Sequence, residues 1–134
     1  MYEIVLGVDD DEARARAQAN ALADMPLDQE SVHATIIHDF THNPEGASVA
    51  QVASVRRARD ILEEAGIEVT LDESSGDPAT QIVAEAEERD ADLICVAGRK
   101  RTPAGKVLFG SVTQAVILDT DRPVLVCSAR DDES

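Results

Sequence analysis

Short apolar runs alternate with helix-patterned segments along the chain, and this alternation restricts the possible folds more than any other feature. Such runs predict strands at 3–8, 32–39, 67–72, 92–97 and 122–127. The intervening patterns predict helices at 12–25, at 48–65, from Pro78 onward, and at 111–118. Strands separated by helices need crossover connections, so we expect a parallel sheet with right-handed crossovers and helices on both faces.

The character of each strand predicts its place in the sheet. Residues 67–72 alternate apolar with polar side chains, as a half-exposed edge strand does, whereas 3–8 and 92–97 are almost continuously apolar and suit the centre. We therefore predict one doubly wound α/β domain, residues 1–130, with strand order 3-2-1-4-5 and a short acidic tail at 131–134. Ligands of such sheets bind beside the carboxyl ends of the strands at the switch point, here between the first and fourth.

Several residues have the character of helix ends or of exposed helix faces. Asp10 or Asp11 is expected to cap the first helix, Asp77 with Pro78 to begin the third, and Gly66 to end the second. The acids of the third helix, Glu85, Glu87 and Glu88, are expected to face water.

The loop at 98–110 is chemically unusual for this chain. Arg99, Lys100, Arg101 and Lys106 lie close together, and no acid occurs between Asp92 and Asp119, although the net charge of the protein is −15. Gly110 and Ser111 follow at the start of a helix, where free N–H groups and the helix dipole favour an anion. We interpret the loop as a phosphate cradle in which Ser111 caps the helix and donates to phosphate. The alternative is a plain strand-to-helix loop with a serine cap.

Composition excludes some functions and indicates a habitat. The acidic balance argues against binding duplex nucleic acid, and the scarcity of aromatic residues argues against single strands. A net charge of −15, with ten arginines but two lysines, predicts a salt-rich, halophile-type cytoplasm, where the Debye length falls to about 3 Å; an ordinary acidic cytosolic protein is the alternative.

No apolar run is long enough to span a membrane and no signal peptide is evident, so a cytoplasmic location is expected. Cys95 and Cys127 are expected to be buried free thiols.

Four segments resemble landmarks of the universal stress protein family, in the right order. They are Ile-Val-Leu-Gly-Val-Asp (4–9), Gly-Asp-Pro-Ala (76–79), Ala-Asp-Leu-Ile-Cys-Val-Ala-Gly (91–98) and the segment 98–112 with Arg-Pro-Val-Leu-Val (122–126). The resemblance covers essentially the whole chain. It implies an adenine nucleotide alpha hydrolase-like fold, a homodimer joined through the fifth strand (Val124 to Cys127), and a stress-response module that binds ATP or AMP without evident catalysis.

The ATP-binding branch of that family carries the pattern G-x2-G-x9-G-(S/T) in this loop. Gly98 matches its first glycine, and Gly110, Ser111 and the following Val112 match its end. Arg101 stands in place of the second glycine, and the next gap is eight residues long. By resemblance, the phosphates of ATP, with Mg²⁺, would lie over Gly98, Arg99, Arg101, Gly110 and Ser111.

The nucleoside would lie at the other end of the same site. Asp9 matches the family's acid after the first strand, near adenosine, and the base is expected near Asp9 and Asp39. The run 9–11 could instead hold Mg²⁺, although a helix-capping turn is the commoner use of such a run. His38 and His42 have ligand-like spacing only on a helix, so no metal site is expected.

Two other functions remain open from the sequence. In the first, a dimer that binds no nucleotide uses its cationic loop to meet a protein partner or a free anion, as Arg101 and the shortened loop allow. In the second, the protein hydrolyses ATP slowly, although no general base is evident near the loop. We expect a binding module and not an enzyme.

Overall fold

The computed structural model describes residues 1–40, 48–98 and 110–128. In chain order the elements are β1 (Tyr2–Gly7), α1 (Glu12–Asp24), η1 (Gln29–Ser31), β2 (Val32–Asp39), η2 (Val49–Gln51), α2 (Ala53–Glu64), β3 (Glu68–Ser74), α3 (Pro78–Glu88), β4 (Leu93–Gly98), α4 (Ser111–Asp119) and β5 (Val124–Ser128). The strands form one sheet in the order β3-β2-β1-β4-β5, and every neighbouring pair is parallel. This confirms the predicted α/β fold and strand order. The helix η1 was not predicted.

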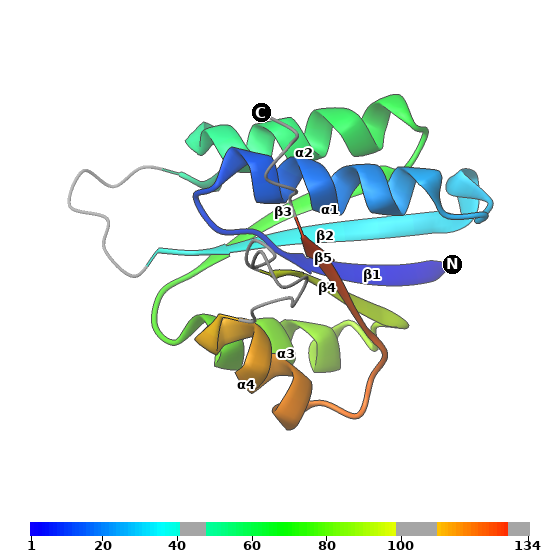
Figure 1. Ribbon diagram of the computed structural model, residues 1–134. Helices are drawn as coiled ribbons and strands as arrows, with labels where there is room; N and C mark the ends of the chain where they lie inside the picture. The colour runs from blue at the N-terminus through cyan, green and yellow to red at the C-terminus, as the bar shows by residue number, and fades with distance from the viewer. Residues whose placement is uncertain (41–47, 99–109, 129–134) are drawn as a thin grey trace, which may run out of the picture.

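Helices cover both faces of the sheet. Figure 1 shows α1 and α2 on one side and α3 and α4 on the other. Consecutive side chains of β1 point to opposite faces of the sheet, as they do along any strand. Ile4 and Leu6 pack in the core beneath α1 and α2, whereas Val5 packs in the core beneath α3 and α4. All three are at most 1% exposed, so β1 is buried on both faces as its apolar run predicts.

Most predicted helix ends are confirmed. The Arg14 N–H donates to Asp11 Oδ1 at 2.9 Å, and the Thr80 N–H donates to Asp77 Oδ2 at 3.0 Å. Hydrogen bonds from the Thr80 side chain and backbone lower the pKa of Asp77. Gly66 has φ +90°, a conformation that glycine adopts without steric cost. Short polar side chains and glycine therefore set these boundaries as the sequence indicates.

Two predicted boundaries are wrong. The segment 48–65 is not one helix, because Val52 is extended (φ −77°, ψ 122°) and separates η2 from α2. The Gln51 side chain accepts a 2.8 Å hydrogen bond from the Ser48 N–H, which closes η2 as a separate turn. At α4 the N-cap residue is Gly110, with an extended backbone, and Ser111 is the first helical residue, so Ser111 does not cap the helix.

Glu85 corrects the prediction that the acids of α3 face water. Glu85 is only 8% exposed, whereas Glu87 and Glu88 are exposed as expected. Burial raises the pKa of the Glu85 carboxyl above its ordinary value of 4.5. Arg89, an ion-pair partner one turn later on the same helix, opposes that shift, and the Asp72 carboxylate of β3 adds to it. Helical periodicity missed this because it carries no information about the Asp72 side chain of β3, which interacts with Glu85.

No helix in the described ranges 1–40, 48–98 and 110–128 has the length and apolar character needed to cross a bilayer.

The buried carboxyl predicts a specific pH dependence. A folded-state pKa above the unfolded value means that the folded protein holds the extra proton, so this group's contribution to stability falls as pH rises above about 4.5. Glu85→Gln removes that titration and should become more stable relative to the parent as pH rises above about 4.5. Urea unfolding midpoints of both proteins at several pH values would measure the difference. Glu88→Gln, on an exposed position of the same helix, is the control, and an equal pH trend in both variants would contradict the assignment.

Candidate functional site

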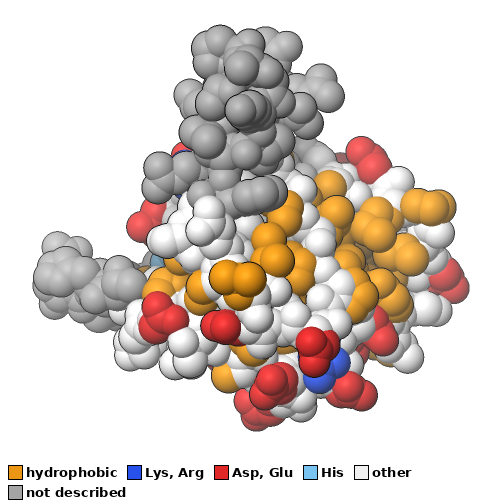
Figure 2. Space-filling view, turned by 60° about the horizontal axis from the view of Figure 1, so that its bottom comes forward, with side chains coloured by type: hydrophobic (Ala, Val, Ile, Leu, Met, Phe, Trp, Pro, Cys, Tyr) orange, Lys and Arg blue, Asp and Glu red, His pale blue; other side chains and the backbone are white. Residues whose placement is uncertain are grey.

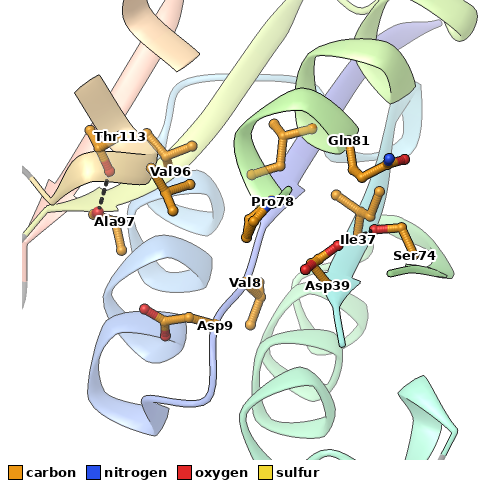
Figure 3. Close-up of a pocket in the computed structure, with 13 residues that line it drawn as sticks. Val8, Asp9, Ile37, Asp39, Ser74, Pro78, Gln81, Val96, Ala97 and Thr113 are labelled. Atoms are coloured by element: carbon orange, nitrogen blue, oxygen red, sulfur yellow. Dashed lines mark hydrogen bonds between the residues drawn. The ribbon is translucent and has the colours of Figure 1, made fainter. Parts of the chain in front are cut away.

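A pocket of about 140 Å³ lies at the carboxyl ends of the central strands. Gly7, Val8 and Asp9 line it from the end of β1, and Val96 and Ala97 line it from β4. The other lining residues come from four neighbouring elements: Ile37, Asp39, Ser74, Pro78, Gln81, Ile82, Val112 and Thr113. Figure 3 shows Val8 between Asp9 and Asp39, with α3 above. This is the switch-point crevice that the strand order predicts.

The inner wall depends on close packing between α3 and β1. A Cβ atom placed on Gly7 would lie 3.0 Å from Ile82 Cγ1 and still closer to Cδ1. Real Cβ atoms essentially never approach other atoms so closely, so any larger residue would displace Ile82. The absence of a side chain at position 7 therefore lets the N-terminal half of α3 lie directly on the strand and form one side of the pocket.

Two carboxylates border the pocket in different surroundings. Asp9 is bound within its own turn: Oδ1 accepts from the Asp11 N–H at 2.9 Å, and Oδ2 pairs with Arg14 at 2.8 Å. Asp39 accepts a 2.9 Å hydrogen bond from the Ser74 hydroxyl at Oδ1. Its Oδ2 atom is buried and has no hydrogen-bond partner within the described residues. Among the described residues, this leaves Asp39 with an unused acceptor beside the pocket, which a donor on a ligand would satisfy.

The strand ends that carry these acids are held by side-chain hydrogen bonds. His38 is 4% exposed, and its Nδ1–H donates to the Val8 carbonyl at 2.7 Å. Its Nε2 lies 3.4 Å from Asp10 Oδ1. On the other side of the pocket, the Thr113 hydroxyl of α4 donates to the Ala97 carbonyl at 2.8 Å, the bond drawn in Figure 3. The first bond holds the end of β1 to β2, and the second holds the end of β4 to α4.

The structure brings together some of the predicted site residues. Asp9, Asp39 and Val112 line the pocket, and Gly98 is buried at the end of β4, directly after Ala97. Gly110 and Ser111 form the N-terminus of α4, but Ser111 is exposed and does not line the pocket. Arg99 and Arg101 lie outside the described residues, as do the rest of the cationic loop and His42.

Three further residues line the pocket without having been indicated by the sequence: Ser74, Gln81 and Thr113. Ser74 ends β3 beside Asp39, and the pairing of the two residues in the sheet follows only from the register. Gln81 lies one helical turn beyond Asp77, so the helix-start signal at Asp77 could have indicated it. No three His, Cys, Asp or Glu side chains within the described part of the chain gather to hold a metal ion.

Nearly the whole chain is similar in sequence to one known protein family. Residues 1–128 match the sequence model of the Universal stress protein family. The chain belongs to the universal stress protein family. It is 34% identical over 73 residues to a universal stress protein of Methanocaldococcus jannaschii, a match that covers 54% of this chain and 43% of that protein. It is 31% identical over 80 residues to a universal stress protein of Mycolicibacterium smegmatis, covering 59% of this chain and 62% of that protein.

Solved structures give the same fold. A universal stress protein from Archaeoglobus fulgidus has a TM-score of 0.76 and 27% identity, and the match covers 95% of this chain and 98% of that one. A universal stress protein in complex with cAMP has a TM-score of 0.69 and 25% identity, with 96% and 97% covered. An Arabidopsis thaliana family protein with AMP bound has a TM-score of 0.72 at 14% identity, with 99% and 95% covered, and shows the fold alone.

The contact between Gly7 and Ile82 can be tested by a compensating pair. Gly7→Ala should destabilise the fold by about 1–3 kcal/mol, because the added methyl group overpacks the contact. Ile82→Val removes the nearest atom and on its own should cost about 0.5–1.5 kcal/mol. Combined, the two substitutions should cost less than Gly7→Ala alone. Urea unfolding of the four proteins would measure the coupling, and strictly additive losses would contradict the packing argument.

Proposed function

We propose that this universal stress protein domain binds an adenine nucleotide, ATP or AMP, in the pocket between β1 and β4. The observation that carries the proposal is the pocket itself, which joins two carboxylates at one end to the N-terminal turn of α4 at the other. A structural relative in complex with cAMP supports the choice of adenine nucleotides. Parallel sheets of this kind bind ligands at this position as a rule.

The chemistry of the walls suits the parts of a nucleotide. Val8, Ile37 and Val96 offer apolar contact to a base, while Asp9 and Asp39 accept hydrogen bonds from ribose hydroxyls or an exocyclic amine. The pocket volume of about 140 Å³ is below the roughly 300–1,000 Å³ of whole ligand sites, so the phosphates would extend beyond it. The N–H groups of the first turn of α4 and the positive end of its dipole would bind them there.

The remaining phosphate contacts are predictions from the sequence. Gly98 would allow close backbone approach, and Arg99 and Arg101 would place guanidinium groups on phosphate oxygens. Magnesium would enter with ATP, held largely by phosphate oxygens and water.

We propose binding without turnover. The only ionisable side chains among the described pocket-lining residues are Asp9 and Asp39, at the end assigned to the nucleoside. A general base for hydrolysis would instead have to reach water beside the terminal phosphate. Slow hydrolysis remains the weaker proposal. A dimer that binds no nucleotide is the second candidate, favoured by Arg101 in place of glycine and by the shortened loop.

A single charge at the start of α4 should test the phosphate site. Ser111 is exposed, and an acid in the first helical turn favours the helix itself, so Ser111→Glu should fold normally. It should weaken AMP binding at least about tenfold by repelling the phosphate, and should leave adenosine binding unchanged. Calorimetric titrations of AMP, ATP with Mg²⁺ and adenosine in molar KCl would measure this.

The control for added charge is Asn20→Asp, which places an acid on an exposed position of α1 on the opposite face of the sheet. Absence of AMP and ATP binding by the parent would refute the proposal and favour the second candidate. Equal loss of AMP and adenosine affinity in Ser111→Glu would refute the placement of the phosphate.

We also propose a homodimer joined through β5. This strand ends the sheet opposite β3, and its Val124, Leu125 and Val126 are only half-buried. Figure 2 shows apolar side chains gathered on the α3 and α4 side of the molecule. Ile117 and Leu118 of α4 are 40% and 83% exposed. An apolar edge strand invites pairing with another chain.

A matched pair of edge lysines would test that dimer. Leu125 on β5 and Leu71 on β3 are both half-buried at an edge of the sheet and pack against the same core. Leu125→Lys should convert a dimer of 14.3 kDa chains to monomer, whereas Leu71→Lys should remain dimeric. Sedimentation equilibrium over a range of concentrations would show it. A parent that stays monomeric, or equal dissociation of both variants, would contradict the β5 interface.

A further inference from the structure

The only two cysteines of the chain meet in the core. Cys95 lies on β4 and Cys127 on the neighbouring β5, and their Sγ atoms are 3.7 Å apart. They are diagonal neighbours in the register, since Cys95 pairs with Leu125 and Cys127 pairs with Ala97. Both side chains therefore lie on the same face of the sheet, beneath α1. The nucleotide proposal uses neither thiol.

The surroundings make the two thiols unequal. Cys95 is fully buried, while Cys127 is 7% exposed and lies one residue before the end of an edge strand. The buried Gln18 side chain of α1 approaches Cys95, with Nε2 at 3.9 Å from its Sγ and 3.3 Å from its carbonyl oxygen. Gln18 Nε2 also donates to the Gly7 carbonyl at 2.9 Å. Cys95 is thus held in place, and Cys127 is the thiol nearer to solvent.

The hydrogen bond between the thiols sharpens this difference. It lowers the pKa of Cys127 and, together with burial, raises the pKa of Cys95 well above its ordinary value. The thiolate is the nucleophile in reactions of cysteine. Cys127 is therefore the thiol that would react first with an oxidant from solution, and Cys95 is the neighbour that would resolve the product.

We propose that Cys95 and Cys127 form an oxidisable dithiol that hydrogen peroxide converts to an intramolecular disulfide between β4 and β5. The Cys127 thiolate attacks one peroxide oxygen, the O–O bond breaks, and the hydroxide released takes up a proton to become water. Cys127 is then a sulfenic acid. The Cys95 sulfur attacks the Cys127 sulfur, the S–O bond breaks, and the departing hydroxide takes the Cys95 proton and leaves as a second water. The two thiols lose two electrons and two protons in total, and the peroxide gains both.

Closing the bond requires a modest movement. The sulfurs must approach from 3.7 Å to about 2.05 Å, the length of a disulfide bond. The edge strand β5 is paired on one side only within the sheet, so its end is the part that can shift. Ala97, the register partner of Cys127, lines the pocket. Oxidation would therefore act at the wall of the proposed nucleotide site, although formation of the disulfide does not depend on that function.

Peptide mapping of the folded protein would test the proposal. Peroxide treatment, alkylation of remaining thiols and trypsin digestion should yield peptides 90–99 and 107–130 linked by a disulfide, two hydrogens lighter than their sum. Dithiothreitol should separate them. The chain should run as a monomer on a denaturing, non-reducing gel, because the bond lies within one chain. The exposure to peroxide is set so that it oxidises the urea-unfolded chain completely. If both thiols of the folded protein are then found alkylated, the proposal is overturned. Disulfides found only between chains would also overturn it.

Single variants would assign the two roles. In Cys95→Ala, Cys127 should still react and accumulate as a sulfenic acid that dimedone traps, since its partner is missing. In Cys127→Ala, the buried Cys95 should react at least about tenfold more slowly. Equal rates in the two variants would overturn the assignment of Cys127 as the attacking thiol. If either variant unfolds, the peptide map of the parent still decides whether the disulfide forms.

Discussion

The structure depends on burying a parallel sheet on both faces. Parallel strands cannot be joined by tight turns, so each connection crosses over the sheet, and helices come to cover both sides. The central strands must then be apolar on both faces, as β1 and β4 are. The same constraint brings the carboxyl ends of all five strands to one edge. The pocket, its two carboxylates and the start of α4 therefore lie together because of the topology, even though they are far apart in the chain.

The two faces of the sheet differ in chemistry. The face beneath α1 and α2 is mostly apolar and contains both thiols. The other face includes a polar row: His33 Nδ1 lies 2.8 Å from Glu3 Oε2, and His33 Nε2 lies 2.7 Å from Thr70 Oγ1. The pair Glu85 and Arg89 of α3 lies near this row, as the influence of Glu3 and Asp72 on the raised pKa of Arg89 indicates. Polar groups that are partly withdrawn from water need partners, and these residues supply them to one another.

The site combines a rigid part and a charged part with different physical origins. Gly7, Val8, His38 and Thr113 hold the pocket walls by close packing and by hydrogen bonds to backbone carbonyls. The cations at 99–106 contrast with the net charge of −15, and the nucleotide proposal assigns phosphate contacts to this cationic stretch of the sequence. The family supplies the fold, and these particular side chains supply the chemistry on which the nucleotide proposal depends.

The sequence by itself determined the class of fold, the strand order and most helix ends, because periodicity, glycine and capping residues act over a few neighbouring positions. It also indicated Asp9, Asp39 and Val112 as residues of one site. It could not place Ser74, Gln81 and Thr113 in the pocket, show that Glu85 is buried, or bring Cys95 to 3.7 Å from Cys127. Those facts depend on register and on helix-to-sheet packing between distant segments. Only the tertiary structure decides them, because local patterns carry no information about which distant side chain lies opposite.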